Sequence, residues 1–323
     1  MKPILVTSYV GPDLDGSACA VAYAEFLNKV GKRAVAGIIG GLHIEAKFAF
    51  EKSGVRMPLR LKNAHGFEHV VLVDTSNLSM FEGKLKPERV IEIIDHRDVH
   101  EAESFPNAKI QIERVGAAAT LIAERFMTIR TTNKIRKYEN STKNKVVISK
   151  ESALLLYGAI ASNTLNFKAI RTTERDKKAF SWLEERAEVD KDFVHKMFLA
   201  KSDLGGARLK EALWSDYSWY TFGGKTVAIA QLEVIGGHEL VENRQDEILS
   251  ELRSIKRERS AHLVFLNIIE LEKNGNIFVA EETEMQVLLS ELFKVSFFKG
   301  IAWHQGLLMR KDIVLTFKRY FEI

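Results

Sequence analysis

The chain has 323 residues, of which 46% are hydrophobic and 28% are charged, and its formal net charge is +4. This length and apolar content predict two domains with cores of their own and exclude an intrinsically disordered chain. The mild positive charge is compatible with an anionic substrate, but it does not by itself indicate a nucleic-acid-binding protein.

The N-terminus and the cysteine content indicate the compartment. Residues 3–8 run directly into an apolar strand, and no apolar stretch approaches the ~18 residues of a membrane span, so we expect a cytoplasmic protein. A single cysteine, Cys19, excludes a disulfide framework and fits a reducing compartment. Its apolar, alanine-rich surroundings predict a buried helical thiol rather than a nucleophile.

The first half of the sequence alternates between strand and helix patterns. The expected elements are strands at 4–7, 34–39, 70–73 and 89–94 and helices at about 17–30 and 44–53. The run at 70–73 is continuously apolar, as in a strand that is buried on both faces of a parallel sheet, and the segment 89–94 follows a similar pattern. The alternation predicts an α/β domain with right-handed crossovers.

The second half begins with a polar stretch at 131–150, rich in Lys, Asn and Thr, which we expect to be a solvated loop insertion. Further expected elements are helices at 151–161, 173–187, much of 190–213 and 239–259, and strands at 226–232, 262–269, 277–280 and 313–317. Gly205-Gly206 is the expected hinge. We therefore predict a first domain over 1–204 and a smaller α/β domain over 205–323.

Acidic and imidazole side chains follow three of the expected strands. Asp13 and Asp15 come after the first strand, Asp74 ends the strand at 70–73, and His96 follows the strand at 89–94. Because the carboxyl ends of parallel strands converge on one crevice, we expect these side chains to meet. Oxygen-rich ligation with one imidazole favours Mn²⁺, Mg²⁺ or Co²⁺, and a pair of such ions could clamp a phosphate. Alternatively, Asp13 and Asp15 are ordinary turn and N-cap residues.

Several features could bind an anion. Arg97 follows His96 and could fork onto phosphate oxygens or form a surface salt bridge. Gly116, before a run of alanines, indicates a helix start that an anion could approach closely, although helix packing explains the alanines equally well. Lys225, Arg310 and Lys311 are candidate phosphate-binding cations in the second domain.

These segments resemble the DHH phosphoesterase superfamily, and within it the family II, manganese-dependent inorganic pyrophosphatases with a DHHA2 C-terminal domain. The resemblance covers nearly the whole chain and rests on the segments 9–15, 72–74, 95–97, 113–116, 158–168, 172–176, 224–227 and 309–311. It implies a parallel-sheet DHH domain, a smaller DHHA2-like substrate-binding domain and an active-site crevice between them. It also implies that the second domain closes over the substrate.

The resemblance assigns roles to individual residues. It implies that Asp13, Asp15, Asp74 and His96 are catalytic metal ligands, and that Arg97, Lys225, Arg310 and Lys311 bind substrate. Three positions depart from the family pattern. A histidine ligand is replaced by Tyr9, a metal-bridging aspartate by Asn163, and the second histidine of the third motif by Arg97. Asn163 can still ligate through its amide oxygen, whereas a tyrosine is a poor ligand unless it is deprotonated. We expect one Mn²⁺ (or Mg²⁺ or Co²⁺) to be held firmly through Asp15, Asp74 and His96, and a second ion weakly or not at all.

Three functional hypotheses follow. The first is a metal-dependent phosphoanhydride hydrolase that acts on pyrophosphate or short polyphosphate. The second is a phosphate- or nucleotide-binding homologue whose catalysis is weakened or lost, as Tyr9 and Asn163 suggest. The third is a phosphodiesterase that acts on oligonucleotides or cyclic dinucleotides. Relatives with those substrates usually carry a Gly-rich phosphate-binding motif in the C-terminal domain, and its absence from this sequence argues against the third hypothesis. All three imply a small phosphate-containing partner, no membrane and no nucleic acid beyond short oligonucleotides; a homodimer is left open.

Overall fold

The computed structural model describes residues 2–98, 100–135 and 146–321, with residues 129–135 given by their backbone alone. The chain divides into two compact units. The first extends to Phe167 and includes Arg171–Met197, and the second consists of Lys168–Ile170 and the chain from Phe198 onward. The domain boundary at 204/205 stays a prediction.

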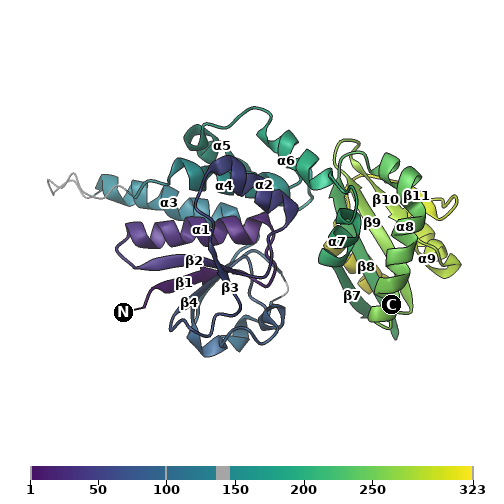
Figure 1. The fold of residues 1–323 in the computed structure, drawn as a ribbon, viewed down its shortest axis with the longest axis horizontal. Coiled ribbons are helices and arrows are strands. Elements are labelled where there is room, and N and C mark those ends of the chain that lie inside the picture. The colour runs from purple at the N-terminus through teal and green to yellow at the C-terminus, as the bar shows by residue number, and fades with distance from the viewer. Residues whose placement is uncertain (1, 99, 136–145, 322–323) are drawn as a thin grey trace. The chain divides into compact units, whose positions relative to one another are not determined.

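A parallel sheet forms the centre of the first unit (Figure 1). Its strand order is β3-β2-β1-β4-β5-β6, and every neighbouring pair is parallel. The strands are β1 (Ile4–Thr7), β2 (Ala34–Ile39), β3 (Leu59–Leu61), β4 (Val70–Val73), β5 (Val90–Asp95) and β6 (Lys109–Ile112). The predicted α/β class is thereby confirmed. The order reverses at β1, which lies between β2 and β4, and ligands of open α/β sheets bind at such a switch point.

Helices gather on one face of this sheet (Figure 1). They are α1 (Leu14–Lys29), α2 (Ile44–Ser53), α3 (Ala118–Ile135), α4 (Lys150–Asn163) and α5 (Glu174–Ala187). Helix α1 packs against β1 and β2, and α4 packs behind it. Small side chains make this close layering possible: Ala18, Cys19 and Ala22 are fully buried. The prediction of a buried helical thiol at Cys19 is confirmed.

The opposite face of the sheet is covered by connecting segments. Short 3₁₀ turns, η1 (Leu78–Phe81), η2 (Pro87–Arg89) and η3 (Ala102–Ser104), lie in the connections between strands. Phe81, Leu85 and Phe105 pack there against Leu5 and Leu72 of the sheet. With both faces covered, β4 is buried along its whole length, as its continuous apolar run predicts.

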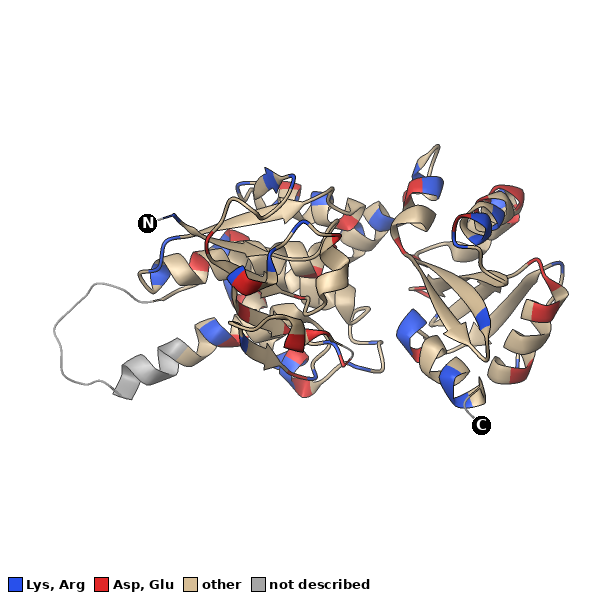
Figure 2. Ribbon diagram, turned by 90° about the horizontal axis from the view of Figure 1, so that it is seen from below, with Lys and Arg blue, Asp and Glu red and all other residues tan. Residues whose placement is uncertain are grey.

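The second unit is built on a mixed five-stranded sheet, in the order β11-β10-β9-β8-β7. Only β8 and β9 pair in parallel. Its elements are α6 (Phe193–Ser202), which begins in the first unit, α7 (Arg208–Ser215), β7 (Tyr217–Phe222), β8 (Lys225–Val234), α8 (Gly237–Glu258), β9 (Leu263–Glu270), β10 (Gly275–Val279), α9 (Thr283–Phe293), β11 (Ile301–Gln305) and α10 (Arg310–Phe321). Charged residues lie mainly on its helices and loops, and its strands are mostly tan in Figure 2.

Two expectations from the sequence are wrong. The apolar run at 313–317 is not a strand but the middle of α10, which buries Ile313, Val314 and Phe317 on one face. A short apolar run has no period long enough to separate helix from strand, and tertiary packing decided between them. The expected loop at 131–150 begins too early, because α3 continues to Ile135 and α4 begins at Lys150. Residues 136–145 of that loop lie outside the described residues.

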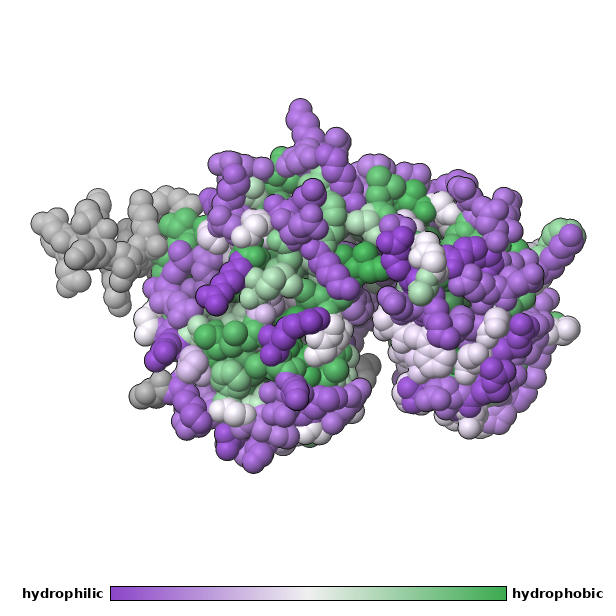
Figure 3. Space-filling view, in the orientation of Figure 1, coloured by the Kyte–Doolittle hydropathy of each residue, from purple (hydrophilic) through white to green (hydrophobic). Residues whose placement is uncertain are grey.

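No helix in the described ranges is both long and apolar enough to cross a membrane. Figure 3 shows hydrophilic side chains over most of one face, with apolar residues in a few areas between them. Folded proteins generally expose this much apolar surface, so the pattern does not mark a particular interface.

Candidate metal centre

The candidate site lies at the carboxyl ends of three adjacent strands. Strand β4 ends at Val73, so Asp74 is the first residue beyond it, and β5 ends at Asp95, directly before His96. Asp15 lies in the first turn of α1, which follows β1. These positions flank the switch point of the sheet, where the strand-end motifs predicted a site.

Three side chains converge there. Ligand atoms of Asp15, Asp74 and His96 all lie within 4.8 Å of one another. Nε2 of His96 is 3.3 Å from Oδ1 of Asp74 and 4.0 Å from Oδ2 of Asp15. Both aspartates are buried, and the His96 side chain is only 10% exposed. Atoms that share an ion at about 2.1 Å lie about 3–4 Å apart, so this spacing suits a common divalent cation.

Asp74 is held in an unusual conformation. Its φ is +55°, in the left-handed region that non-glycine residues rarely adopt. Its backbone N–H donates to the carbonyl of Ile94 at 2.8 Å, which ties it to β5. Oδ1 of Asp74 is buried and accepts no hydrogen bond from the described residues. Strain of this kind together with an unsatisfied buried acceptor is typical of a ligand-binding position.

Asp15 is fixed by the N-terminus of α3. The backbone N–H groups of Ala118 and Ala119 both donate to its carboxylate at 2.8 Å. The thiol of Cys19 also donates to it, at 3.4 Å. The small residues after Gly116 were expected to admit an anion, and the anion that approaches the α3 N-terminus is this protein's own Asp15.

A second buried carboxylate, Asp176, positions that same helix start. It accepts hydrogen bonds from the Gly116 N–H at 2.9 Å and the Thr120 hydroxyl at 2.6 Å, and it closes a capping box with Thr173 at the start of α5. A Cβ at Gly116 would come within 2.6 Å of the Thr164 side chain. Sequence reasoning missed this role of Asp176, although the Thr-x-x-Asp pattern of a capping box was available as a signal.

His96 is oriented for binding through one particular nitrogen. Its Nδ1 lies 3.0 Å from the carbonyl of Val115, which can only accept, so Nδ1 carries the proton. In the neutral imidazole, Nε2 then carries the lone pair, which faces Asp15 and Asp74. Asp95 supports this arrangement by accepting hydrogen bonds from the His96 N–H at 2.8 Å and from the Ser76 hydroxyl. Supporting contacts of this kind are usual around metal-binding histidines.

The charges of the cluster perturb one another. Burial and the nearby Asp74 raise the pKa of Asp15. Burial would also raise the pKa of Asp74, but Arg97 and His96 hold it below its ordinary value. Burial lowers the pKa of His96, but Asp74 and Asp15 outweigh that effect and raise it. Two carboxylates and an imidazole crowded together in this way favour a cation among them.

Asp13 lies beside this cluster but is not one of its three members. Its Oδ1 accepts the Gly16 N–H at 3.0 Å as the N-cap of α1, as the alternative interpretation of the sequence has it. Burial, then Asp74 and Glu45, raise the pKa of Asp13 to about 6. The Asp13 backbone N–H donates to the hydroxyl oxygen of Tyr9 at 3.2 Å. Burial and the charges of Asp13 and Asp74 raise the pKa of Tyr9, so its phenol stays neutral.

Arg97 and Asn163 complete the surroundings. The Arg97 guanidinium lies 3.4 Å from Oδ2 of Asp74 and 5.1 Å from the centre of the Tyr9 ring. Asn163, the last residue of α4, donates its side-chain N–H to Oδ2 of Asp15 at 2.6 Å. The amide nitrogen of Asn163, rather than its oxygen, therefore faces Asp15.

Two of the candidate cations of the second unit have partners within that unit. Lys225 pairs with Glu284, and Arg310 pairs with Asp216 at 2.5 Å. Burial lowers the pKa of Arg310, but Asp216 outweighs it and raises the pKa, so Arg310 stays charged. Lys311 is the next residue in the first turn of α10.

The residues at the strand ends fit a divalent cation. The unsatisfied Oδ1 of Asp74, the free Nε2 of His96 and a carboxylate oxygen of Asp15 form a mixed O/N donor set of the kind that Mn²⁺ accepts. Carboxylate oxygens can accept a cation beside their hydrogen bonds, because each has more than one lone pair.

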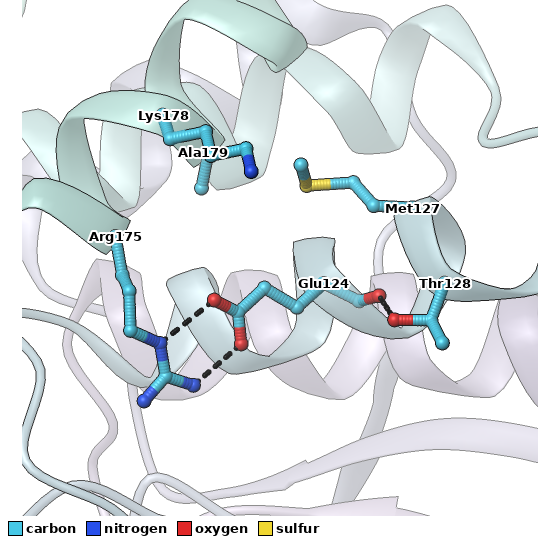
Figure 4. A pocket seen from close by; sticks show the side chains of 6 residues that line it. All are labelled: Glu124, Met127, Thr128, Arg175, Lys178 and Ala179. Carbon is cyan, nitrogen blue, oxygen red and sulfur yellow. Dashed lines mark hydrogen bonds and ion pairs between the residues drawn. The ribbon is translucent and has the colours of Figure 1, made fainter. Parts of the chain in front are cut away.

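A pocket lies elsewhere in the first unit, between α3 and α5 (Figure 4). Its lining residues are Glu124, Met127, Thr128, Arg175, Lys178 and Ala179. Arg175 donates to both carboxylate oxygens of Glu124, at 2.8 and 2.6 Å, and its Nη1 is 2.7 Å from Glu113. This guanidinium is already neutralised by two carboxylates, so the pocket offers an anion little uncompensated charge from it.

Family models match both units of the chain. The model described as "DHH family, N-terminal domain" matches residues 3–160, and the one described as "DHHA2 domain" matches residues 195–316. The N-terminal half of the chain therefore matches the DHH domain and the C-terminal part matches the DHHA2 domain.

Named relatives are similar over nearly the full length. The "Probable manganese-dependent inorganic pyrophosphatase" of Clostridium acetobutylicum is 26% identical over 315 residues, which cover 97% of this chain and 96% of the relative. The "Manganese-dependent inorganic pyrophosphatase" of Bacillus subtilis is 28% identical, with coverages of 98% and 97%. A solved structure from Methanococcus jannaschii, titled as a "putative family II inorganic pyrophosphatase", is 28% identical and has a TM-score of 0.77, with coverages of 99% and 100%.

Proposed function

Because this chain belongs to the DHH family and carries a C-terminal DHHA2 domain, we propose that it is a metal-dependent phosphoanhydride hydrolase whose substrate is pyrophosphate or short polyphosphate. Relatives of similar length are named as manganese-dependent inorganic pyrophosphatases, which supports the substrate class. The observation that carries the proposal is the convergence of Asp15, Asp74 and His96 around the unsatisfied Oδ1 of Asp74.

In this proposal Asp15, Asp74 and His96 hold one divalent cation, with Mn²⁺ the expected ion. A bound cation of this kind polarises a phosphoryl oxygen and lowers the pKa of a bound water. During hydrolysis the water oxygen bonds to one phosphorus while the bridging P–O bond breaks, and its electron pair leaves on the second phosphate. The water gives up one proton in this step, and a carboxylate of the cluster is proposed to accept it.

Positive side chains are also proposed to bind the substrate. The Arg97 side chain is 30% exposed, so it reaches solvent beside Asp74 and can donate to a phosphate. Lys225, Arg310 and Lys311 are proposed to bind phosphate oxygens, and Asn163 to support the metal site. Their charge and polarity support these roles, and the pairing of Arg310 with Asp216 fixes one guanidinium near the start of α10.

The test is phosphate release from pyrophosphate, tripolyphosphate and a dinucleotide, each with Mn²⁺, Co²⁺ or Mg²⁺. We expect release from the two inorganic substrates and a loss of about 10³-fold or more in Asp74→Ala, since the metal contributes several kcal/mol to the transition state. Circular dichroism of the variant checks that it is folded.

Two outcomes would replace the proposal. Tight pyrophosphate binding without turnover under every metal would make the chain a phosphate-binding homologue. Cleavage of the dinucleotide alone would make it a phosphodiesterase.

A further inference from the structure

The two carboxylate oxygens of Asp74 face two different groups. Oδ1 lies 3.3 Å from Nε2 of His96, on the side shared with Asp15, where a divalent cation fits. Oδ2 lies 3.4 Å from Nη2 of Arg97. Asp74 therefore bridges a metal position on one side and a guanidinium on the other.

The position of Arg97 is fixed from several directions. Its guanidinium lies 5.1 Å from the centre of the Tyr9 ring, and its Nε is 3.7 Å from Oδ1 of Asp95. Nη1 of Arg97 also contacts the Met80 sulfur at 3.6 Å. A cation held by an aromatic face and two buried carboxylates is a built-in part of the site rather than a mobile surface charge.

The remaining donors on this side are poor ligands for a second ion. The Tyr9 hydroxyl already accepts the N–H of Asp13 at 3.2 Å, and a phenol is a poorer metal ligand than the histidine of the family pattern. Asn163 turns its amide N–H toward Asp15, where a carboxylate would have added a negative charge. Asp13 is the remaining carboxylate near Tyr9. Among the described residues, Arg97 forms ion pairs with Asp74 and Asp95 but not with Asp13.

The guanidinium of Arg97 supplies positive charge where a second ion would lie. Oδ2 of Asp74 and Oδ1 of the buried Asp95 both face it, at 3.4 and 3.7 Å. A divalent cation placed beside Oδ2 of Asp74 would meet this fixed positive charge in a largely buried site, where like charges repel strongly.

We propose that the guanidinium of Arg97 takes the place of a second metal ion, so that the centre binds one divalent cation beside one permanent organic cation bridged to it by Asp74. This inference rests on the proposed metal site, although it does not require that the substrate be pyrophosphate. It assigns to Arg97 a role in setting the metal stoichiometry, in addition to any contact with a phosphate.

The experiment counts Mn²⁺ ions per chain on the full-length protein without substrate. Metal-free protein is titrated with Mn²⁺, and bound ions are measured by calorimetry and by the electron paramagnetic resonance signal of free Mn²⁺. We expect one ion per chain up to a free concentration about 100 times the first dissociation constant. Two ions, or none, in the wild-type chain would overturn the inference.

Two variants isolate the role of Arg97. The double variant Tyr9→His with Asn163→Asp supplies extra donors but keeps the guanidinium on Asp74, so we expect it still to bind one ion. Adding Arg97→His frees Oδ2 of Asp74, and we expect this triple variant to bind two. A second ion in the double variant, or only one in the folded triple variant, would show that Arg97 does not exclude the ion.

A matched control removes a different stacked guanidinium. Arg186 lies 4.0 Å from the centre of the Trp182 ring and, in the described part of the chain, contacts none of the three aspartates. Arg186→Gln should therefore leave the stoichiometry at one. Because the ions are counted without substrate, a chain that binds one ion but releases no phosphate would contradict the proposed function and leave this inference intact.

Discussion

Each unit contains a cluster of buried polar side chains. The two clusters differ in whether their hydrogen-bond donors and acceptors find partners among the residues of the chain. In the second unit Gln231, Asn267 and Asn276 stand on the adjacent strands β8, β9 and β10. The Asn276 side-chain N–H donates to Oδ1 of Asn267 at 2.5 Å, and Oε1 of Gln231 accepts the backbone N–H of Arg310 at 2.7 Å. We call these three residues the amide row.

The amide row forms a complete hydrogen-bonded network. The Leu308 carbonyl accepts from Asn267 at 2.9 Å and from Asn276 at 2.7 Å, while the Leu308 N–H donates to Oδ1 of Asn276 at 2.9 Å. The network thus ties the segment before α10, and with it the backbone of Arg310, to the sheet. In the first unit, by contrast, Oδ1 of Asp74 has no hydrogen-bond donor among the described residues.

The difference shows how burial can be used in two ways. Neutral amides carry both donors and acceptors, so a row of them can satisfy itself and stabilise a fold. Carboxylates only accept, and the three that crowd after β1 and β4 (Asp13, Asp15 and Asp74) need a cation from outside. We call Asp13, Asp15 and Asp74 the aspartate cluster. The amide row is therefore expected to matter for stability, and the aspartate cluster for cation binding.

Asp74→Asn would make the aspartate cluster more like the amide row. The substitution removes one negative charge from a proposed metal ligand. We expect it to weaken Mn²⁺ binding by at least about 100-fold, because changes to residues that only support a ligand already cost about 10–100-fold. Isothermal titration calorimetry measures the effect. Asp98→Asn is the matched control, because Asp98 pairs with Arg171 instead. Equal Mn²⁺ affinity in both variants would contradict the assignment of Asp74 as a ligand.

Asn267→Leu would break the amide row while nearly keeping its volume. It leaves partners of Asn267 buried without hydrogen bonds, so we expect the free energy of unfolding to fall by about 2 kcal/mol. Urea denaturation followed by tryptophan fluorescence reports mainly on this unit, which contains Trp214, Trp219 and Trp303. Asn243→Leu, at an exposed position of α8 in the same unit, should cost less than about 0.5 kcal/mol. Equal losses in the two variants would mean that the row is not a stabilising network.

Much of the first unit could be predicted from local sequence signals. A continuous apolar run identified β4 and a largely apolar segment identified β5. Polar residues at the strand ends identified the positions of Asp74 and His96, because sheet topology brings such ends together. The run at 313–317 was misassigned because five apolar residues fit either a strand or a buried helix face. The short strands β6 and β11 and the helix α9 gave no signal that was recognised.

The fine structure of the site depends on contacts between residues far apart in the chain. Asp176 holds the Gly116 N–H from 60 residues away, and Asn163 donates to Asp15 across 148 residues. No local pattern states which atom of an amide faces a carboxylate, since this is decided by the tertiary network. The sequence could identify Arg97 as a cation but not the orientation of its guanidinium toward Oδ2 of Asp74.

The smallest expected effect is a pH dependence that only the aspartate cluster should show. In the metal-free protein the pKa of Asp13 is about 6, above its ordinary value of 3.8, so the folded state binds this proton more tightly than the unfolded state. Stability is then gained as the pH falls and lost as it rises through 6. From pH 7 to 5 we expect a gain of about 1 kcal/mol from Asp13, in the same direction as the raised pKa values of Asp15 and His96.

Urea unfolding followed by circular dichroism in EDTA at pH 7, 6 and 5 measures this gain, and Asp13→Asn should reduce it. With excess Mn²⁺ the sign should reverse, because acid protonates the ligands and releases the ion, which otherwise stabilises the folded chain. Asn267→Leu should shift both curves without changing their slopes, since the amide row has no proton to exchange in this range. A metal-free protein that loses stability between pH 7 and 5 would show that the aspartates are not crowded as the structure places them.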